Sequence, residues 1–93
     1  MRILLSVLVL VLAVGPLLAQ KKVSDDMLVD QVRVRLADDA EVGGQQIDVD
    51  AHQGVVTLKG KVRSDKQKSK AEKLAKKVKG VGSVINQLVI SPD

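Results

Sequence analysis

The sequence predicts an α+β domain with the order helix, strand, strand, helix, strand, in which two helices pack on one face of a three-stranded mixed sheet. Apolar residues recur every three or four positions over residues 24–38 and 64–78, as in amphipathic helices. They alternate with polar residues over 47–51 and 55–62, as in half-buried strands, and an apolar segment at 84–90 supplies a third strand. Since crossover connections are right-handed, the third strand should run parallel to the second and complete the sheet.

The first helix is expected to begin after Ser24, whose hydroxyl can cap it, with two aspartates next to the positive end of the helix dipole. Its apolar face is formed by residues four positions apart: Leu28, Val32 and Leu36. The helix should end near Ala37 or Asp38. A polar loop containing Gly43 and Gly44 then leads to the sheet.

The next two segments predict a β-hairpin with a short turn at His52, Gln53 and Gly54. Gly60 stands where the second strand should place a core side chain, so a close approach of a helix, or a bulge, is expected there. The open face of the sheet should carry mostly polar side chains: Asp48, Asp50, Thr57, Lys59 and Lys61.

The second helix has a capping-box pattern, with Ser64 as the cap and Gln67 three positions later. Its core stripe has helical spacing: Ala71, Leu74, Ala75 and Val78. Gly80 is expected to end this helix, and Pro92 is expected to end the last strand.

The first residues have the three-part plan of a secretory signal peptide. Arg2 precedes an apolar run over residues 3–14, Gly15 and Pro16 break it, and Ala19 suits the position before a cut. We therefore expect a signal peptide at 1–19, a basic tail at 20–23 and a domain at 24–91, in a periplasmic or secreted protein. An uncleaved membrane anchor is the alternative. Because the chain has no cysteine, lipid attachment through a thiol is excluded.

Composition argues against several classes of function. Phe, Tyr and Trp are all absent, so no aromatic platform exists on which bases could stack, and nucleic acid is not an expected partner. The chain has one histidine, His52, and no thiol, and no nucleophile stands beside a base. Asp48 and Asp50 form the best carboxylate pair, but they lie on an open strand face. We expect no enzyme activity, no cofactor and no metal site.

The second helix carries the candidate binding residues. On a helical wheel Lys66, Lys70, Lys73 and Lys77 form one ridge pointing away from the core, with Lys76 nearby. Glu72 is the only acid within the helix after Asp65. Like charges four apart cost a few tenths of a kcal/mol each, which favours a use such as binding an anionic bilayer surface. A solvated helix face is the competing interpretation. No exposed aromatic or large apolar wedge is expected, so any insertion into a bilayer should be shallow.

A protein-interaction role is the alternative function. The last strand is expected at an edge of the sheet, where Ile85 and Val89 would be exposed. Residues 20–50 have a net charge of −4 and residues 51–93 a net charge of +7, so two copies could also pair head to tail. The partner would then be an envelope protein or a second copy in a weak homo-oligomer.

The whole pattern resembles the BON domain family of bacterial envelope proteins. The resemblance rests on spaced residues in the first helix (Asp25, Leu28, Val32, Leu36), on GVVTLKGKV at 54–62, on Ala71 and Ala75, and on KGVGSVINQLVI at 79–90. It implies an αββαβ fold, a periplasmic or envelope location, association with anionic phospholipid, and a role in envelope maintenance or osmotic stress. The chain departs from the family pattern at Gln53, where Asn or Asp is common, and it carries a single copy of the domain.

Overall fold

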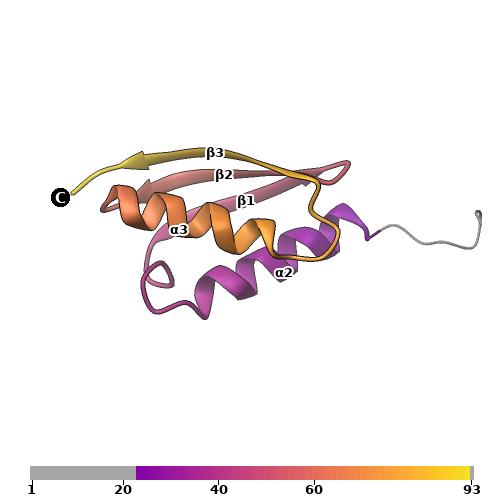
Figure 1. The fold of residues 1–93 in the computed structure, drawn as a ribbon, viewed down its shortest axis with the longest axis horizontal. Coiled ribbons are helices and arrows are strands. Elements are labelled where there is room, and N and C mark those ends of the chain that lie inside the picture. The colour runs from indigo at the N-terminus through magenta and orange to yellow at the C-terminus, as the bar shows by residue number, and fades with distance from the viewer. Residues whose placement is uncertain (1–22, 93) are drawn as a thin grey trace, which may run out of the picture.

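The computed structural model describes residues 23–92 and contains two helices on one face of a three-stranded sheet (Figure 1). The elements follow the predicted order: α2 at Asp25–Ala37, β1 at Gln46–His52, β2 at Val55–Val62, α3 at Asp65–Lys76 and β3 at Ser83–Ile90. The predicted α+β class is therefore confirmed. The predicted signal peptide and most of the basic tail lie outside the described residues.

The sheet is mixed, with strand order β1-β2-β3. β1 pairs antiparallel with β2, and β2 pairs parallel with β3 through the crossover helix α3. In this register Leu58 of the central strand lies between Val49 of β1 and Asn86 of β3. Both β1 and β3 are thus edge strands.

The hairpin turn has two residues, one fewer than the sequence predicts. His52 already pairs with Val55, so only Gln53 and Gly54 make the turn, and both have positive φ, 51° and 83°. Two consecutive positive φ angles are typical of the type I′ turn that matches the twist of a hairpin. The Gln53 backbone N–H also donates to Asp25 Oδ2 at 3.2 Å, which ties the turn to the start of α2.

The core lies between the helices and the sheet and consists entirely of aliphatic side chains: Leu28, Val32, Leu36, Val42, Val49, Val56, Leu58, Val62, Ala71, Ala75, Val78 and Leu88. Val42 is a core residue that the sequence did not predict, because it lies in the loop between α2 and β1. The Asp39 carboxylate accepts backbone hydrogen bonds from Glu41 and Val42 and so folds this loop inward over the core.

Both helices begin at the serines predicted to cap them. The Ser24 hydroxyl accepts from Met27 N–H and the Ser64 hydroxyl from Gln67 N–H, each at 3.2 Å. Gln67 differs from a standard capping box, because its side chain accepts from the N–H of Arg63 at 2.7 Å rather than from that of the cap residue. Its amide also donates to the Glu41 carbonyl, so the start of α3 is bound to the α2–β1 loop.

Gly60 is required for a reason that differs from the two predicted. No bulge interrupts the β1–β2 register, and a helix is not the nearest neighbour. Its φ is +123°, and an added Cβ would overlap the carbonyl oxygen of Gln46 on β1. The close approach is therefore made by the neighbouring strand.

Candidate functional site

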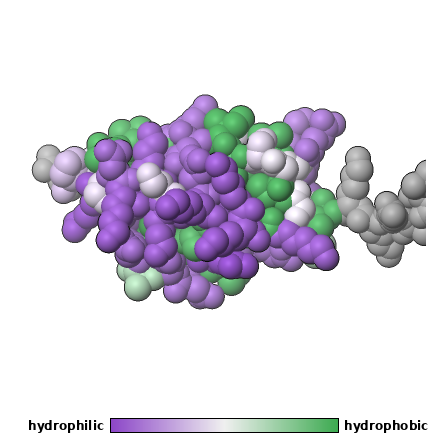
Figure 2. Space-filling view, in the orientation of Figure 1, coloured by the Kyte–Doolittle hydropathy of each residue, from purple (hydrophilic) through white to green (hydrophobic). Residues whose placement is uncertain are grey.

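Helix α3 lies over β2 and β3 and runs beside α2 in the opposite direction (Figure 1). Its apolar stripe is buried through Ala71 and Ala75, so its lysines face outward or toward the flanks of the helix. Figure 2 views the molecule from this side and shows hydrophilic side chains over most of the helical layer. The predicted ridge is thus present, but its members have different surroundings.

The first half of the ridge is neutralised by acids that come from the α2–β1 loop. Lys70 Nζ lies 3.2 Å from Glu41 Oε1 and 3.5 Å from Asp39 Oδ2, and Lys66 Nζ lies 3.5 Å from Glu41 Oε2. The Lys70 side chain is only 37% exposed. The prediction from sequence considered only acids within the helix and so missed Asp39 and Glu41. The loop that carries them is brought next to α3 by the tertiary fold.

These ion pairs shift the pKa values of the loop acids and of Lys70. The hydrogen bond from Lys70 lowers the pKa of Glu41 below its ordinary value of 4.5. The hydrogen bond from the Glu41 backbone N–H, helped by Lys70, lowers the pKa of Asp39 below 3.8. The hydrogen bond to Glu41, followed by the charge of Asp39, raises the pKa of Lys70 above 10.5. Each partner is therefore held in its charged form.

We expect this cluster to make stability depend on pH at its acidic limit. A carboxyl with a lowered folded-state pKa stabilises the fold above its unfolded pKa and loses that contribution as pH falls through the folded value. The stabilisation should therefore be complete above about pH 5 and fade from about pH 4.5 downward. Lys70→Met should lower the melting temperature near neutral pH and have progressively less effect in this acidic range, as measured by far-UV circular dichroism. Lys73→Met, which removes a lysine from the same helix, is the control. A constant difference between wild type and Lys70→Met from pH 7 to pH 3 would contradict this prediction.

Lys76 is also paired, but on the flank of α3 that faces β3. Its Nζ lies 2.9 Å from Glu72 Oε2, one helical turn away. Hydrogen bonds from Lys76 and then from Asn86 lower the pKa of Glu72. Asn86 in turn donates to the Lys68 carbonyl at 2.9 Å and binds α3 to β3. Lys76 therefore belongs to a structural contact between helix and strand.

Lys73 and Lys77 are the two ridge lysines without an ion pair to any residue of the described segment, and both are exposed. Lys77 lines a shallow groove of about 500 Å³ between α2 and α3. The groove also contains Lys79 and Arg35, the apolar side chains of Val34 and Val78, and two aspartates. Unpaired cations thus gather at the outer face of α3 and at its junction with α2.

One apolar side chain that the sequence did not predict is exposed beside these lysines. Val34 is 60% exposed and lies in the same groove as Lys77. It follows the core residue Val32 by two positions and so faces away from the core. The groove therefore offers an apolar contact beside its cations.

The residues predicted for protein interaction lie on the opposite face of the sheet. Ile85 and Val89 are 46% and 59% exposed, and both project from the open face of edge strand β3. On that face β3 adjoins Thr57 and Lys61 of β2. The structure thus keeps the lysine ridge and this apolar pair on separate surfaces.

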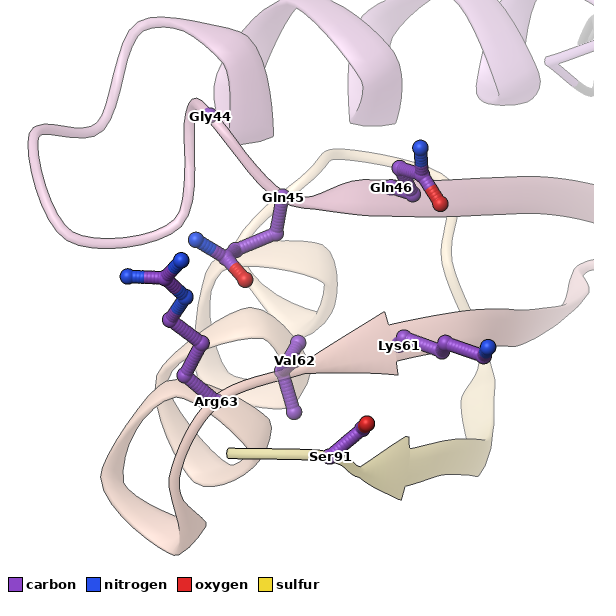
Figure 3. Close-up of a pocket in the computed structure, with 7 residues that line it drawn as sticks. All are labelled: Gly44, Gln45, Gln46, Lys61, Val62, Arg63 and Ser91. Atoms are coloured by element: carbon purple, nitrogen blue, oxygen red, sulfur yellow. The ribbon is translucent and has the colours of Figure 1, made fainter. Parts of the chain in front are cut away.

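Two further basic residues lie near a groove at the end of the sheet where β2 and β3 terminate, but they do not converge. Lys61 and Arg63 both line this groove of about 600 Å³ together with Gln45 and Ser91. Figure 3 shows their side chains pointing away from each other. A single phosphate could not engage both in this arrangement.

The residues considered for catalysis are not assembled into a site. His52 is exposed at the end of β1, and Asp48 and Asp50 are exposed on the open face of the sheet. Within residues 23–92, no group of three His, Cys, Asp or Glu side chains could hold a metal ion. The same residues include no helix long and apolar enough to cross a membrane.

Comparison with known families agrees with this geometry. The family model described as the BON domain matches residues 24–92. The chain belongs to the BON domain family. Proteins with a BON domain are typically periplasmic or envelope-associated, and the domain is generally a non-catalytic binding module. No curated protein matches the chain.

Proposed function

We propose that this BON domain binds anionic phospholipid surfaces weakly and reversibly through the outer face of α3 and its junction with α2. The observation that carries the proposal is the pair of exposed lysines, Lys73 and Lys77, that form no ion pair with any acid in residues 23–92. Lys79 and Arg35 add charge beside Lys77, and Val34 adds an apolar contact. The physiological setting we propose is envelope maintenance or osmotic stress.

The strength of such binding follows from simple electrostatics. A lysine or arginine near an anionic surface contributes about 1 kcal/mol, so four cations supply about 4 kcal/mol at most. Asp30 and Asp38, which line the same groove, reduce this attraction. Attraction over more than the Debye length of about 8 Å is screened at physiological salt. Val34 is too small to anchor the domain in the acyl region, so the attachment should be reversible and sensitive to salt.

Lys66, Lys70 and Lys76 have a secondary part in this proposal. Each already has a carboxylate partner, and a lipid phosphate would have to compete with it. Their contribution should therefore be smaller than that of Lys73 or Lys77. The solvated helix face proposed as the alternative describes these three lysines better.

The test is co-sedimentation of residues 20–93 with vesicles. This segment contains every residue of the core, so it retains the packing described above. Phosphatidylglycerol vesicles should pellet the protein at low salt and much less at physiological salt, and phosphatidylcholine vesicles should not pellet it. Detection should be by gel, because the chain has no aromatic residue. Equal pelleting with both vesicles, or none with either, would contradict the proposal.

A further inference from the structure

Strand β3 is a sheet edge without the protection that such edges usually have. All eight residues, Ser83–Ile90, pair in continuous register with β2, and none of them is charged or a proline. Exposed edges are normally blocked by charged residues, prolines or bulges, because their free backbone groups can pair with another chain. The other edge, β1, carries Asp48 and Asp50. The two edges therefore differ, and only β3 suits strand pairing.

Hydrogen bonds at the two ends of β3 show which of its backbone groups face β2 and which face the free edge. Ser83 N–H donates to the Gly54 carbonyl and Ser91 N–H to the Val62 carbonyl, both toward β2. Backbone groups alternate in direction along a strand, so odd-numbered residues face β2 and even-numbered residues face the free edge. Leu88 agrees with this alternation. Its N–H does not donate to β2 but to the side-chain oxygen of Asn86 on the same strand, at 3.2 Å.

We infer that β3 pairs antiparallel with β3 of a second copy, around a two-fold axis at Gln87. In this register two edge-facing pairs, Val84 with Ile90 and Asn86 with Leu88, exchange backbone hydrogen bonds. The Leu88 N–H then exchanges its bond to the Asn86 side chain for one to the Asn86 carbonyl of the other copy. The pairs between them are Ile85 with Val89 and Gln87 with itself. Such non-hydrogen-bonded pairs bring side chains closest together.

This register is selected by the exposed apolar side chains of β3. Ile85, Val89 and Ile90 are three of the five large hydrophobic residues exposed in the described segment. Centring the pairing on Gln87 places each of them opposite an apolar residue of the other copy. A shift of the centre to residue 86 would oppose Ile85 to Gln87, and a shift to 88 would oppose Val89 to Gln87. Figure 2 shows hydrophobic side chains at the upper margin of the molecule, where β3 runs in Figure 1.

The helices oppose this pairing only weakly by charge. The flank of α3 beside the β3 edge carries both signs, with Asp65 and Glu72 among Lys68, Lys73 and Lys76. A two-fold axis perpendicular to the sheet would place both α3 helices on one face of a continuous six-stranded sheet. The second copy is therefore compatible in backbone, side chains and charge.

The first test is the mass of residues 20–93 in solution, measured by sedimentation velocity over a range of concentrations. Wild type should approach twice the monomer mass as concentration rises. Val89→Lys, which places a charge within the paired strands, should remain a monomer at every concentration. Asp48→Lys places the same residue on the open face of the other edge strand and should still form the dimer. A monomeric wild type, or a dimer unaffected by Val89→Lys, would overturn the inference.

A second test reports the register. Because the chain has no cysteine, a single introduced thiol can be followed without background. Gln87→Cys would bring two Cα atoms to about 4.5 Å across the axis, a separation that a disulfide can span. Mild oxidation should therefore link Gln87→Cys into a covalent dimer. Ser83→Cys should stay unlinked, because Ser83 lies opposite Ser91 in this register. Equal linking of the two variants would overturn the register.

Discussion

Replacing Gly60 by alanine should destabilise the domain by about 3 kcal/mol or more, from the summed costs of a strained backbone and an overpacked contact. Gly60 has a φ of +123°, which residues with a side chain rarely adopt. The new methyl group would also overlap the Gln46 carbonyl oxygen of the neighbouring strand. Because the methyl group is fixed to the β2 backbone and the oxygen belongs to the β1 backbone, neither can move without breaking the β1–β2 register.

Gly44→Ala is the matched control for this substitution. Gly44 lies in the α2–β1 loop, and no atom lies within 4 Å of the position that its Cβ would take. It should therefore unfold at nearly the wild-type urea concentration, whereas Gly60→Ala should lose most of its folded signal without denaturant. Similar urea midpoints for the two variants would show that the strand does not constrain Gly60.

Leu58→Ala should cost about 2–5 kcal/mol, as expected for large-to-small substitutions in a well-packed core. Leu58 is fully buried in the central strand, between Val49 and Asn86 of the two flanking strands. The core has no aromatic residue that could move into the space. Because a domain of this size has little stability in reserve, the variant should be partly unfolded at 37 °C.

Met27→Ala provides the comparison, since it also removes three side-chain heavy atoms. Met27 is on the exposed side of α2, so its change in unfolding free energy should stay within about 0.5 kcal/mol. Both variants can be measured by urea denaturation followed with far-UV circular dichroism. A loss below about 1 kcal/mol for Leu58→Ala would mean that the packing around β2 is looser than described.

Most of the fold could be predicted because its signals are local. The caps Ser24 and Ser64 precede their helices directly, and strand alternation identifies Ile85 and Val89 as a pair on one face. The reason for Gly60 could not be found in this way. It depends on how closely Gln46 of another strand approaches, and sequence spacing carries no information on that distance.

At the candidate site, the lysine ridge shows the same limit of prediction from sequence spacing. Helical spacing correctly placed Lys70 on the ridge, but its partners Asp39 and Glu41 are about thirty residues earlier in the chain. They meet Lys70 only because the α2–β1 loop folds inward over Val42. An acidic loop next to a basic helix in the same small domain was a usable signal. Without the topology, however, it could not assign a partner to each lysine.

The most direct test of the proposed membrane contact compares two charge reversals of equal size on opposite faces. Lys73→Glu with Lys77→Glu alters the outer side of α3, and Lys59→Glu with Lys61→Glu alters the open face of the sheet. Binding to phosphatidylglycerol vesicles at low salt should be lost in the first double variant and largely kept in the second, with both folded by circular dichroism. Equal losses would mean that net charge alone governs binding. Unchanged binding by the α3 variant would show that α3 does not contact the membrane.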